Sequence, residues 1–205
     1  MIAIIDYDAG NIKSVEKALL SFGEEVILTR DRDVILQAEK VILPGVGAFG
    51  DAMEKIRGYG LEEVIHEVIE MGTPFLGICL GLQLLFESSD ECQGVAGLGI
   101  LKGQIKRIPD QEGLKIPQIG WNSLHFPKEG KLFQGIHEGA YVYFVHSYYL
   151  SAEEDIVTAT TDYSTLIHAS VEKDNVFACQ FHPEKSSEVG LQILRNFVRI
   201  GREEE

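Results

Sequence analysis

The first half of the chain alternates short apolar runs with segments whose apolar positions recur at helical spacing. The apolar runs predict buried strands, and they occupy residues 2–5, 26–29, 40–43 and 73–78. Helical patterns occupy residues 12–22, 34–38, 49–57 and 61–71. In the first helix, Leu20 is expected on the buried face and Gly23 just beyond the end. Continuously apolar strands that alternate with helices indicate a mostly parallel sheet covered on both faces.

The second half of the chain has a different pattern, in which strands are separated by turns that carry Gly, Asp and Asn. The predicted strands cover residues 100–108, 121–126, 141–150, 156–161, 166–171 and 176–181, and a closing helix covers 188–200. We expect this half to add a mixed or antiparallel layer to an open, mostly parallel α/β sheet. Residues 1–205 are predicted to form a single domain.

Composition excludes several classes of protein. A net charge of −14 leaves no basic face of the kind that nucleic acids or anionic membranes require. The longest uncharged stretch spans only 16 residues, 71–86, so no membrane span is expected, and the N-terminus lacks the basic region of a signal peptide. Three cysteines without a CxxC pair predict a reducing, cytoplasmic setting and no metal site; no cofactor is expected.

Cys79 lies where the strand pattern changes to a helical one, with Gly77 and Gly81 on either side. A nucleophile on a sharp strand-to-helix turn needs such small residues, because strand and helix approach closely there. A helix N-terminus also favours the thiolate form of a cysteine. A lone cysteine is more often a small buried hydrophobe, but the flanking glycines favour a nucleophile here. The backbone N–H of Leu80 would then face a developing oxyanion.

The segment His182-Pro183-Glu184 follows the last predicted strand. In an extended segment, His182 and Glu184 project to the same side, and Pro183 restricts His182 to that conformation. A carboxylate placed in this way can orient the imidazole as the base for a thiol. Active crevices of open α/β sheets lie at the carboxyl ends of strands, so a triad with Cys79 is predicted. His146 is the rival base, although no carboxylate lies within a few residues of it.

The turn Pro44-Gly45-Val46-Gly47 follows the strand predicted over 40–43. It can be read as an ordinary glycine loop, but its position suggests a second oxyanion donor, the N–H of Val46 or Gly47. Glycines on both sides of Val46 would let a peptide unit turn between donor-in and donor-out states. We hypothesise that this turn switches the activity on and off.

These motifs resemble those of the class I (triad) glutamine amidotransferases, and the resemblance extends over essentially the whole chain. Within that class, the chain is similar to the glutaminase subunits of imidazole glycerol phosphate synthases, on the segments 44–47, 120–122 and 181–186. The resemblance implies a flavodoxin-like fold and hydrolysis of glutamine to glutamate and ammonia. Cys79 would form a γ-glutamyl thioester, His182 would transfer protons, and Glu184 would orient the imidazole. The implied glutamine site comprises Gly45, Gln83, Glu91, Ser147 and Tyr148.

The resemblance also implies a heterodimer with a (βα)₈-barrel cyclase subunit, which receives the ammonia in histidine biosynthesis. The positions that match the family's partner contacts are Asn11, Trp121, Tyr143 and Lys185. A helix-capping Asn, core aromatics and a solvated Lys are the alternative interpretations of these residues. Asp8 and Gln118 depart from the family's pattern near the expected interface, where Gly and His are usual.

Three alternatives remain open from the sequence. The triad does not distinguish this pathway from other glutaminases, such as those of pyridoxal phosphate or anthranilate synthase. A cysteine peptidase or γ-glutamyl hydrolase on the same fold would act fully without a partner. A flavodoxin-like binding module without enzyme activity is disfavoured by the presence of Cys79, His182 and Glu184 together.

Overall fold

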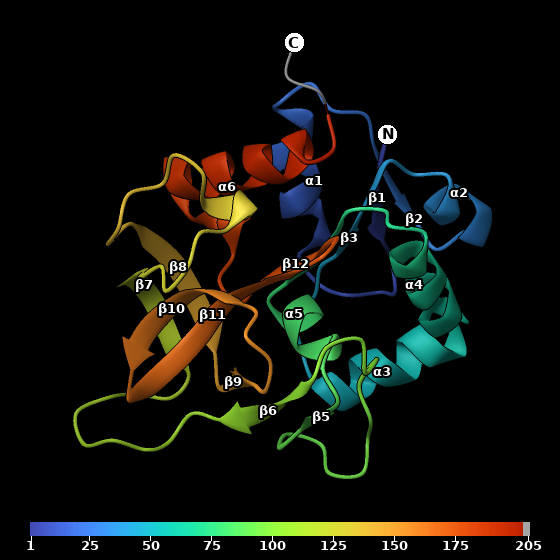
Figure 1. Cartoon of the computed structure of the whole chain (residues 1–205). Helices are drawn as coiled ribbons and strands as arrows, with labels where there is room; N and C mark the ends of the chain where they lie inside the picture. The colour runs from blue at the N-terminus through green and yellow to red at the C-terminus, as the bar shows by residue number, and fades with distance from the viewer. Residues whose placement is uncertain (203–205) are drawn as a thin grey trace.

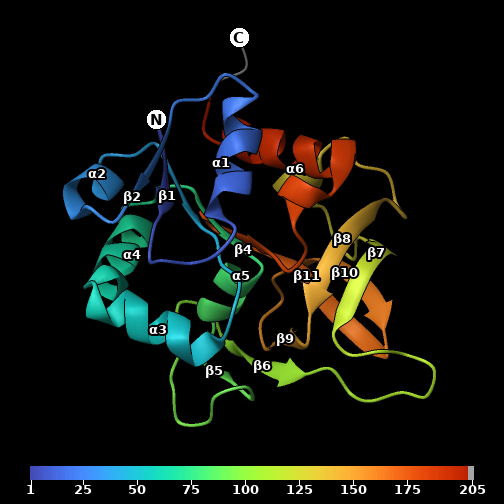
Figure 2. The same cartoon turned by 180° about the vertical axis from the view of Figure 1, so that it is seen from behind.

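The computed structural model describes residues 1–202, so residues 203–205 of the predicted single domain lie outside the described residues. Its centre is a seven-stranded sheet in the order β10-β11-β12-β4-β3-β1-β2 (Figures 1 and 2). All pairings from β12 to β2 are parallel, and β10 and β11 add an antiparallel edge. The strands are β1 Ile2–Ile5, β2 Val26–Thr29, β3 Lys40–Leu43, β4 Phe75–Ile78, β10 Val157–Tyr163, β11 Thr165–Lys173 and β12 Val176–Cys179. The predicted open, mostly parallel α/β sheet is therefore confirmed.

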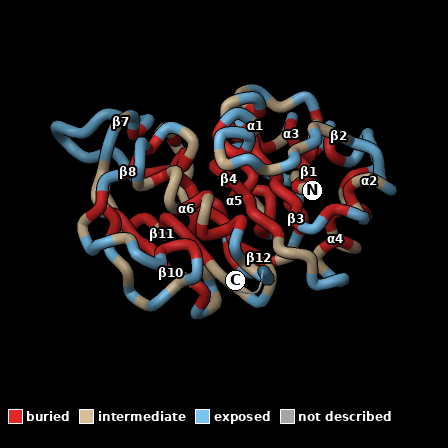
Figure 3. The backbone as a smooth tube through the Cα atoms, turned by 90° about the horizontal axis from the view of Figure 1, so that it is seen from above, coloured by how far each residue is buried: buried red, intermediate tan, exposed pale blue. Residues whose placement is uncertain are grey.

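Helices cover both faces of this sheet (Figure 1). One face packs against α1 (Ile12–Leu20) and α6 (Ser187–Arg199). The other face packs against α2 (Arg32–Leu36), α3 (Phe49–Gly58), α4 (Leu61–Glu70) and α5 (Leu80–Leu84). Along β1, Ile2 and Ile4 enter one apolar cluster and Ala3 and Ile5 enter the other. Because both faces are buried (Figure 3), strands β1, β4 and β12 contain only apolar residues and glycine.

The second half of the chain also builds two small sheets beside the central one. Strands β5 (Ser88–Ser89), β6 (Gly103–Arg107) and β9 (Tyr148–Ala152) form a three-stranded sheet. Strands β7 (Gln118–Ser123) and β8 (Tyr141–His146) form an antiparallel pair. Two 3₁₀ turns, η1 (Lys131–Phe133) and η2 (Pro183–Lys185), complete the described elements.

Three predictions about these elements were wrong in detail. The strand predicted over 141–150 is two strands, because the chain passes from one small sheet to another at Ser147. The strand predicted over 121–126 begins at Gln118. Helix α1 ends at Leu20, which is 50% exposed and not buried as predicted. The buried face of the helix contains Ala18 and Leu19, and Leu20 points away from it.

None of the helices within residues 1–202 is long and apolar enough to cross a membrane.

Candidate active site

Cys79 sits on the turn between β4 and α5, at the carboxyl end of the sheet. Its backbone is strained, with φ 55° and ψ −108°. A Cβ on Gly77 would lie 2.8 Å from the carbonyl oxygen of Gly81, and one on Gly81 would lie 1.8 Å from that of Leu43. Both glycines are therefore required by close backbone approach, which is the geometry expected of a nucleophile elbow.

His182 lies just beyond β12, which pairs in parallel with the strand that leads to Cys79. Its Nδ1 is 2.8 Å from Oε1 of Glu184, and both side chains are almost fully buried. The reason predicted for this contact was wrong, because Glu184 lies in the 3₁₀ turn η2 and not in an extended segment. The turn nevertheless brings the carboxylate to the imidazole. The side-chain amide of Asn11 donates a second hydrogen bond to Oε1, at 3.2 Å.

The environment of His182 favours the charged imidazolium. Burial lowers the pKa of His182, but interactions with Cys79 and Glu184 outweigh it and raise the pKa to about 9. The other ring nitrogen, Nε2, is buried and has no hydrogen-bond partner of standard geometry among the described residues. It is therefore the nitrogen left free to exchange a proton with the thiol.

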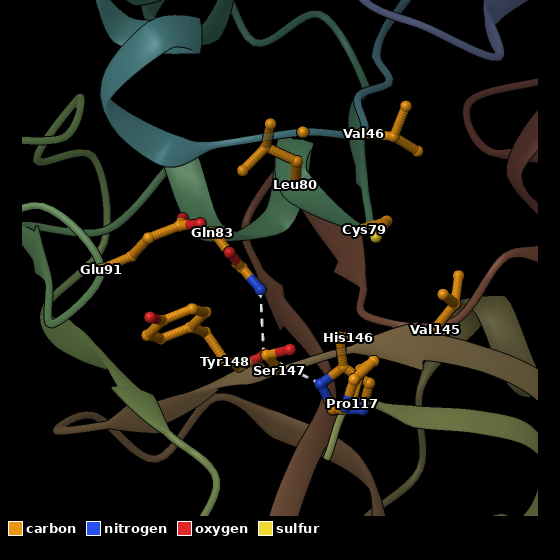
Figure 4. Close-up of a pocket in the computed structure, with 11 residues that line it drawn as sticks. Val46, Cys79, Leu80, Gln83, Glu91, Pro117, Val145, His146, Ser147 and Tyr148 are labelled. Atoms are coloured by element: carbon orange, nitrogen blue, oxygen red, sulfur yellow. Dashed lines mark hydrogen bonds between the residues drawn. The ribbon is translucent and has the colours of Figure 1, made fainter.

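A pocket of about 310 Å³ opens beside the sulfur of Cys79 (Figure 4). A volume of this size suits a small ligand. The predicted residues that line it are Val46, Gly47, Cys79, Leu80, Gln83, Glu91, Ser147 and Tyr148. Gly45 does not line this pocket; together with Asn11, His182 and Glu184 it borders a narrow space that leaves no room for a water molecule.

Two polar side chains in the pocket wall already have protein partners. The amide of Gln83 points across the pocket and donates to the backbone carbonyl of Tyr148, at 3.0 Å (Figure 4). The carboxylate of Glu91 accepts a hydrogen bond of 2.9 Å from the N–H of Phe49, the first residue of α3. The pocket therefore presents an amide and a carboxylate in defined positions, as recognition of a small polar molecule requires.

The predicted oxyanion donors are not all free. The N–H of Leu80 donates to the carbonyl of Gly45, at 3.2 Å. The carbonyl of Gly45 would have to turn away before the N–H of Leu80 could donate a hydrogen bond to an oxyanion. The hydroxyl of Tyr7, whose pKa is raised by burial and by Cys79, donates to the neighbouring carbonyl of Pro44, at 2.8 Å. Tyr7 thus holds the start of the segment Pro44–Gly47, while Val46 and Gly47 lie exposed.

His146, the rival base, has both ring nitrogens engaged. Nδ1 is 2.8 Å from the carbonyl of Tyr148, and Nε2 is 2.7 Å from the side-chain amide of Gln118. Burial lowers the pKa of His146 to about 4. A neutral imidazole with no free nitrogen does not suit the role of a base. Gln118, one of the two departures from the family's pattern, therefore has a local structural role.

The residues predicted to contact a partner are partly exposed. Trp121, which is 51% exposed, packs edge-on against Tyr143, with ring centroids 6.1 Å apart, across the β7–β8 pair. Lys185 is exposed. Asp8, the other departure, adopts a left-handed φ of 62°, which explains why glycine also suits this position. Asp8 accepts hydrogen bonds from Arg30 and Tyr59.

Sequence reasoning missed three residues at this site. Pro117 and Val145 line the pocket, and no local signal identified them. Gln180, which is fully buried, donates from Nε2 to Sγ of Cys79, at 3.7 Å. The signal that could have identified Gln180 is its position, a polar residue at the end of an apolar strand and two residues before His182.

Comparison with known proteins identifies the class to which this fold and site belong. The profile of the family described as "Glutamine amidotransferase class-I" matches residues 3–200, so the chain belongs to the class I glutamine amidotransferases. Solved structures agree on the fold: a crystal structure of a glutamine amidotransferase superposes with a TM-score of 0.76 at 19% identity, covering 97% of both chains. The structure of PurLQS from Thermotoga maritima gives a TM-score of 0.70 at 21% identity, also covering 97% of both chains.

More similar relatives narrow the family. The imidazole glycerol phosphate synthase subunit HisH of Moorella thermoacetica is 52% identical over 98% of this chain and 95% of its own length. HisH of Caldanaerobacter subterraneus is 53% identical, over 96% of this chain and 97% of its own. HisH of Methanocaldococcus jannaschii is 48% identical, over 98% and 100%. The chain is therefore a member of the HisH family, which confirms the resemblance found in the sequence.

Proposed function

We propose that this chain is the glutaminase subunit of an imidazole glycerol phosphate synthase, and that Cys79, His182 and Glu184 are its catalytic triad. The observation that carries the proposal is the buried His182–Glu184 pair, in which His182 interacts with Cys79, itself a lining residue of the pocket of about 310 Å³. High identity to HisH subunits over nearly the whole chain supports the pathway. Three free cysteines in residues 1–202 are consistent with work in the cytoplasm.

The reaction that we assign to the triad proceeds in two halves. Cys79 gives its proton to His182 and attacks the side-chain carbonyl carbon of glutamine. The C–N bond then breaks as His182 returns the proton to the leaving nitrogen, which yields ammonia and a γ-glutamyl thioester. Water, deprotonated by His182, attacks the thioester; the C–S bond breaks, glutamate leaves, and the sulfur regains its proton from His182. Glu184 keeps the imidazole oriented throughout.

The glutamine site of this proposal comprises Gln83, Glu91 and the backbone at Ser147 and Tyr148, which line the pocket, whereas the predicted Gly45 does not line it. Glu91 offers a carboxylate to the substrate ammonium, and Gln83 offers a side-chain amide. The oxyanion would be held by the N–H groups of Leu80 and of Val46 or Gly47. In this structure the Leu80 N–H donates its hydrogen bond to the Gly45 carbonyl. We therefore propose that the 44–47 segment changes its backbone conformation before catalysis, which frees this N–H. The same peptide orientation with and without partner and bound glutamine analogue would contradict this step.

The ammonia would pass to a (βα)₈-barrel cyclase partner. We propose that the contact surface includes Asn11, Trp121, Tyr143 and Lys185. Trp121 and the neighbouring Ile119, which are 51% and 64% exposed, offer the large apolar side chains that interfaces favour. The contact of Asn11 with Glu184 would connect this surface with the triad.

One assay tests the proposal directly. Glutaminase activity is measured with and without the cyclase and its nucleotide substrate, for wild type and for Cys79→Ala. We expect little activity alone and strong stimulation in the complex. Cys79→Ala should abolish turnover, because the nucleophile is gone, and leave complex formation intact. Full activity without a partner would instead favour a stand-alone hydrolase, and stimulation by the partner of another pathway would reassign the subunit.

A further inference from the structure

Gln180 is a polar residue placed beside the sulfur by the central sheet. Strands β12 and β4 pair in parallel with Cys179 opposite Ile78, and the N–H of Cys79 donates to the carbonyl of Cys179, at 2.8 Å. Gln180 and Cys79, the residues that follow these two strands, therefore lie side by side. The Gln180 backbone is held from the other side, where its N–H donates to the carbonyl of Ala169. Its side chain is fully buried, so both polar atoms need protein partners.

A neighbouring backbone carbonyl determines which atom of the Gln180 amide faces the sulfur. The carbonyl of Tyr148 can only accept, so the group of Gln83 that faces it, at 3.0 Å, must be its NH₂. The same NH₂ lies 3.0 Å from Gln180, so the atom of Gln180 on that side must be the acceptor Oε1. Nε2 of Gln180 therefore faces Sγ of Cys79, at 3.7 Å. The amide cannot be reversed without placing two NH₂ groups against each other.

We propose that Gln180 is a further catalytic residue, whose amide N–H binds the sulfur of Cys79 and stabilises its thiolate. This inference rests on the proposed function, in which Cys79 is the nucleophile. Hydrogen bonds to an ionised acceptor are about twice as strong as neutral ones, so the contact strengthens when the sulfur is charged. That happens when Cys79 gives up its proton and again when the thioester C–S bond breaks. In the buried site, Gln180 supplies the stabilisation that water would give an exposed thiolate.

Gln180 and His182 have different roles at the sulfur of Cys79. His182 exchanges the proton through Nε2, whereas Gln180 has no proton to give up and acts only as a donor. The side-chain NH₂ of Gln83 donates to Oε1 of Gln180 and so holds the Gln180 amide in one orientation. A link therefore runs from the pocket wall at Tyr148 through two glutamine side chains to the nucleophile.

The test measures the reactivity of Cys79 without using glutamine. The full-length chain is alkylated with iodoacetamide between pH 5 and 10, and the label on Cys79 is followed by mass spectrometry of its peptide, which separates it from Cys92 and Cys179. In Gln180→Met, which keeps the size but removes the donor, we expect the pH midpoint of alkylation to rise by about one unit. The kcat of the complex with the cyclase should fall about tenfold. Gln192→Met on α6 is the matched control and should leave both unchanged.

A second variant keeps the test decisive if Gln180→Met does not fold. Gln180→Glu is nearly isosteric and keeps an acceptor for Gln83, but it turns a carboxylate oxygen toward the sulfur, so its midpoint should rise further than that of Gln180→Met. If the folded variants have the wild-type midpoint and kcat while Cys79→Ala is inactive, the role of Gln180 is overturned and the proposed function stands. If Cys79→Ala keeps its glutaminase activity, the proposed function fails instead, and the role of Gln180 in that reaction fails with it.

Discussion

Two buried histidines, His182 and His146, lie in the region of Cys79, and their surroundings move their pKa values in opposite directions. His182, at the end of β12, has a pKa raised to about 9, and His146, at the end of β8, has one lowered to about 4. Burial opposes the charge in both. His182 has the carboxylate of Glu184 and the thiol of Cys79 as partners, whereas His146 has only a neutral carbonyl and an amide.

Burial alone therefore does not raise the pKa of an imidazole. A buried imidazole becomes basic only when a charged partner compensates for the loss of water. The charged partner of His182 is Glu184, which lies in the turn η2. The partners of His146 are neutral hydrogen-bonding groups.

The largest effect should come from removing the charge behind His182. Glu184→Gln keeps the shape but replaces the carboxylate, so the pKa of His182 should fall from about 9 and the imidazole should lose its orientation. We expect kcat in the complex to fall by about 10²–10⁴-fold, the usual contribution of a general base. Steady-state glutaminase kinetics over a pH series check this. Glu188→Gln, an exposed carboxylate in the first turn of α6, is the control. Equal kcat for both variants would contradict the assignment of Glu184.

The next effect concerns stability in acid. The pKa of His146 is about 4 in the folded chain and about 6.5 when unfolded, so the unfolded chain binds the proton first as pH falls. The stabilisation from a neutral His146 is present above pH 6.5 and is lost as pH falls toward 4. It amounts to about 3 kcal/mol. Urea unfolding at pH 7, 6, 5 and 4 should show a smaller loss in His146→Asn than in wild type. His137→Asn, at an exposed position, should follow wild type.

The smallest effect should come from the amide that steadies Glu184. Asn11→Gly removes the hydrogen bond to Oε1, and glycine accepts the left-handed φ of 65° at this position. We expect kcat to fall about three- to tenfold, with KM unchanged, because one hydrogen bond contributes about 1 kcal/mol. The assay is run at saturating cyclase, so that weaker docking does not lower the rate. Ser14→Ala, which removes only the bond to Oδ1 of Asn11, should have a smaller effect. A raised KM with unchanged kcat would assign Asn11 to substrate binding instead.

The fold was largely predictable because its strands are short, apolar and separated by helical patterns. β1, β2 and β3 begin and end where the apolar runs do. The second half was less predictable, because its strands change sheets without a break in the apolar pattern. Ser147 illustrates this: it separates β8 from β9 inside a run that reads as one strand.

The candidate active site also has features that the sequence predicts and features that it does not. Gly77 is a local signal, because the backbone that a side chain there would meet is that of Gly81, within the same turn; Gly81 is required by Leu43 at the end of β3, which is distant in sequence. The contact between His182 and Glu184 was also predictable from their spacing, although the backbone conformation behind it was not. No local pattern showed that Gly45 occupies the N–H of Leu80, because that bond depends on how β3 and β4 end side by side.

Local sequence patterns located the strand-to-helix turn at Cys79, singled out the candidate catalytic residues, and indicated a mostly parallel α/β sheet beneath them. The pKa values of the two imidazoles, the engagement of the Leu80 N–H, and the contact of Gln180 with a sulfur 101 positions away in the chain follow from the packing of distant segments. The physical reason is that strand periodicity and backbone strain act over a few residues. Hydrogen bonding and desolvation act through space, between groups that only the pairing of distant strands brings together.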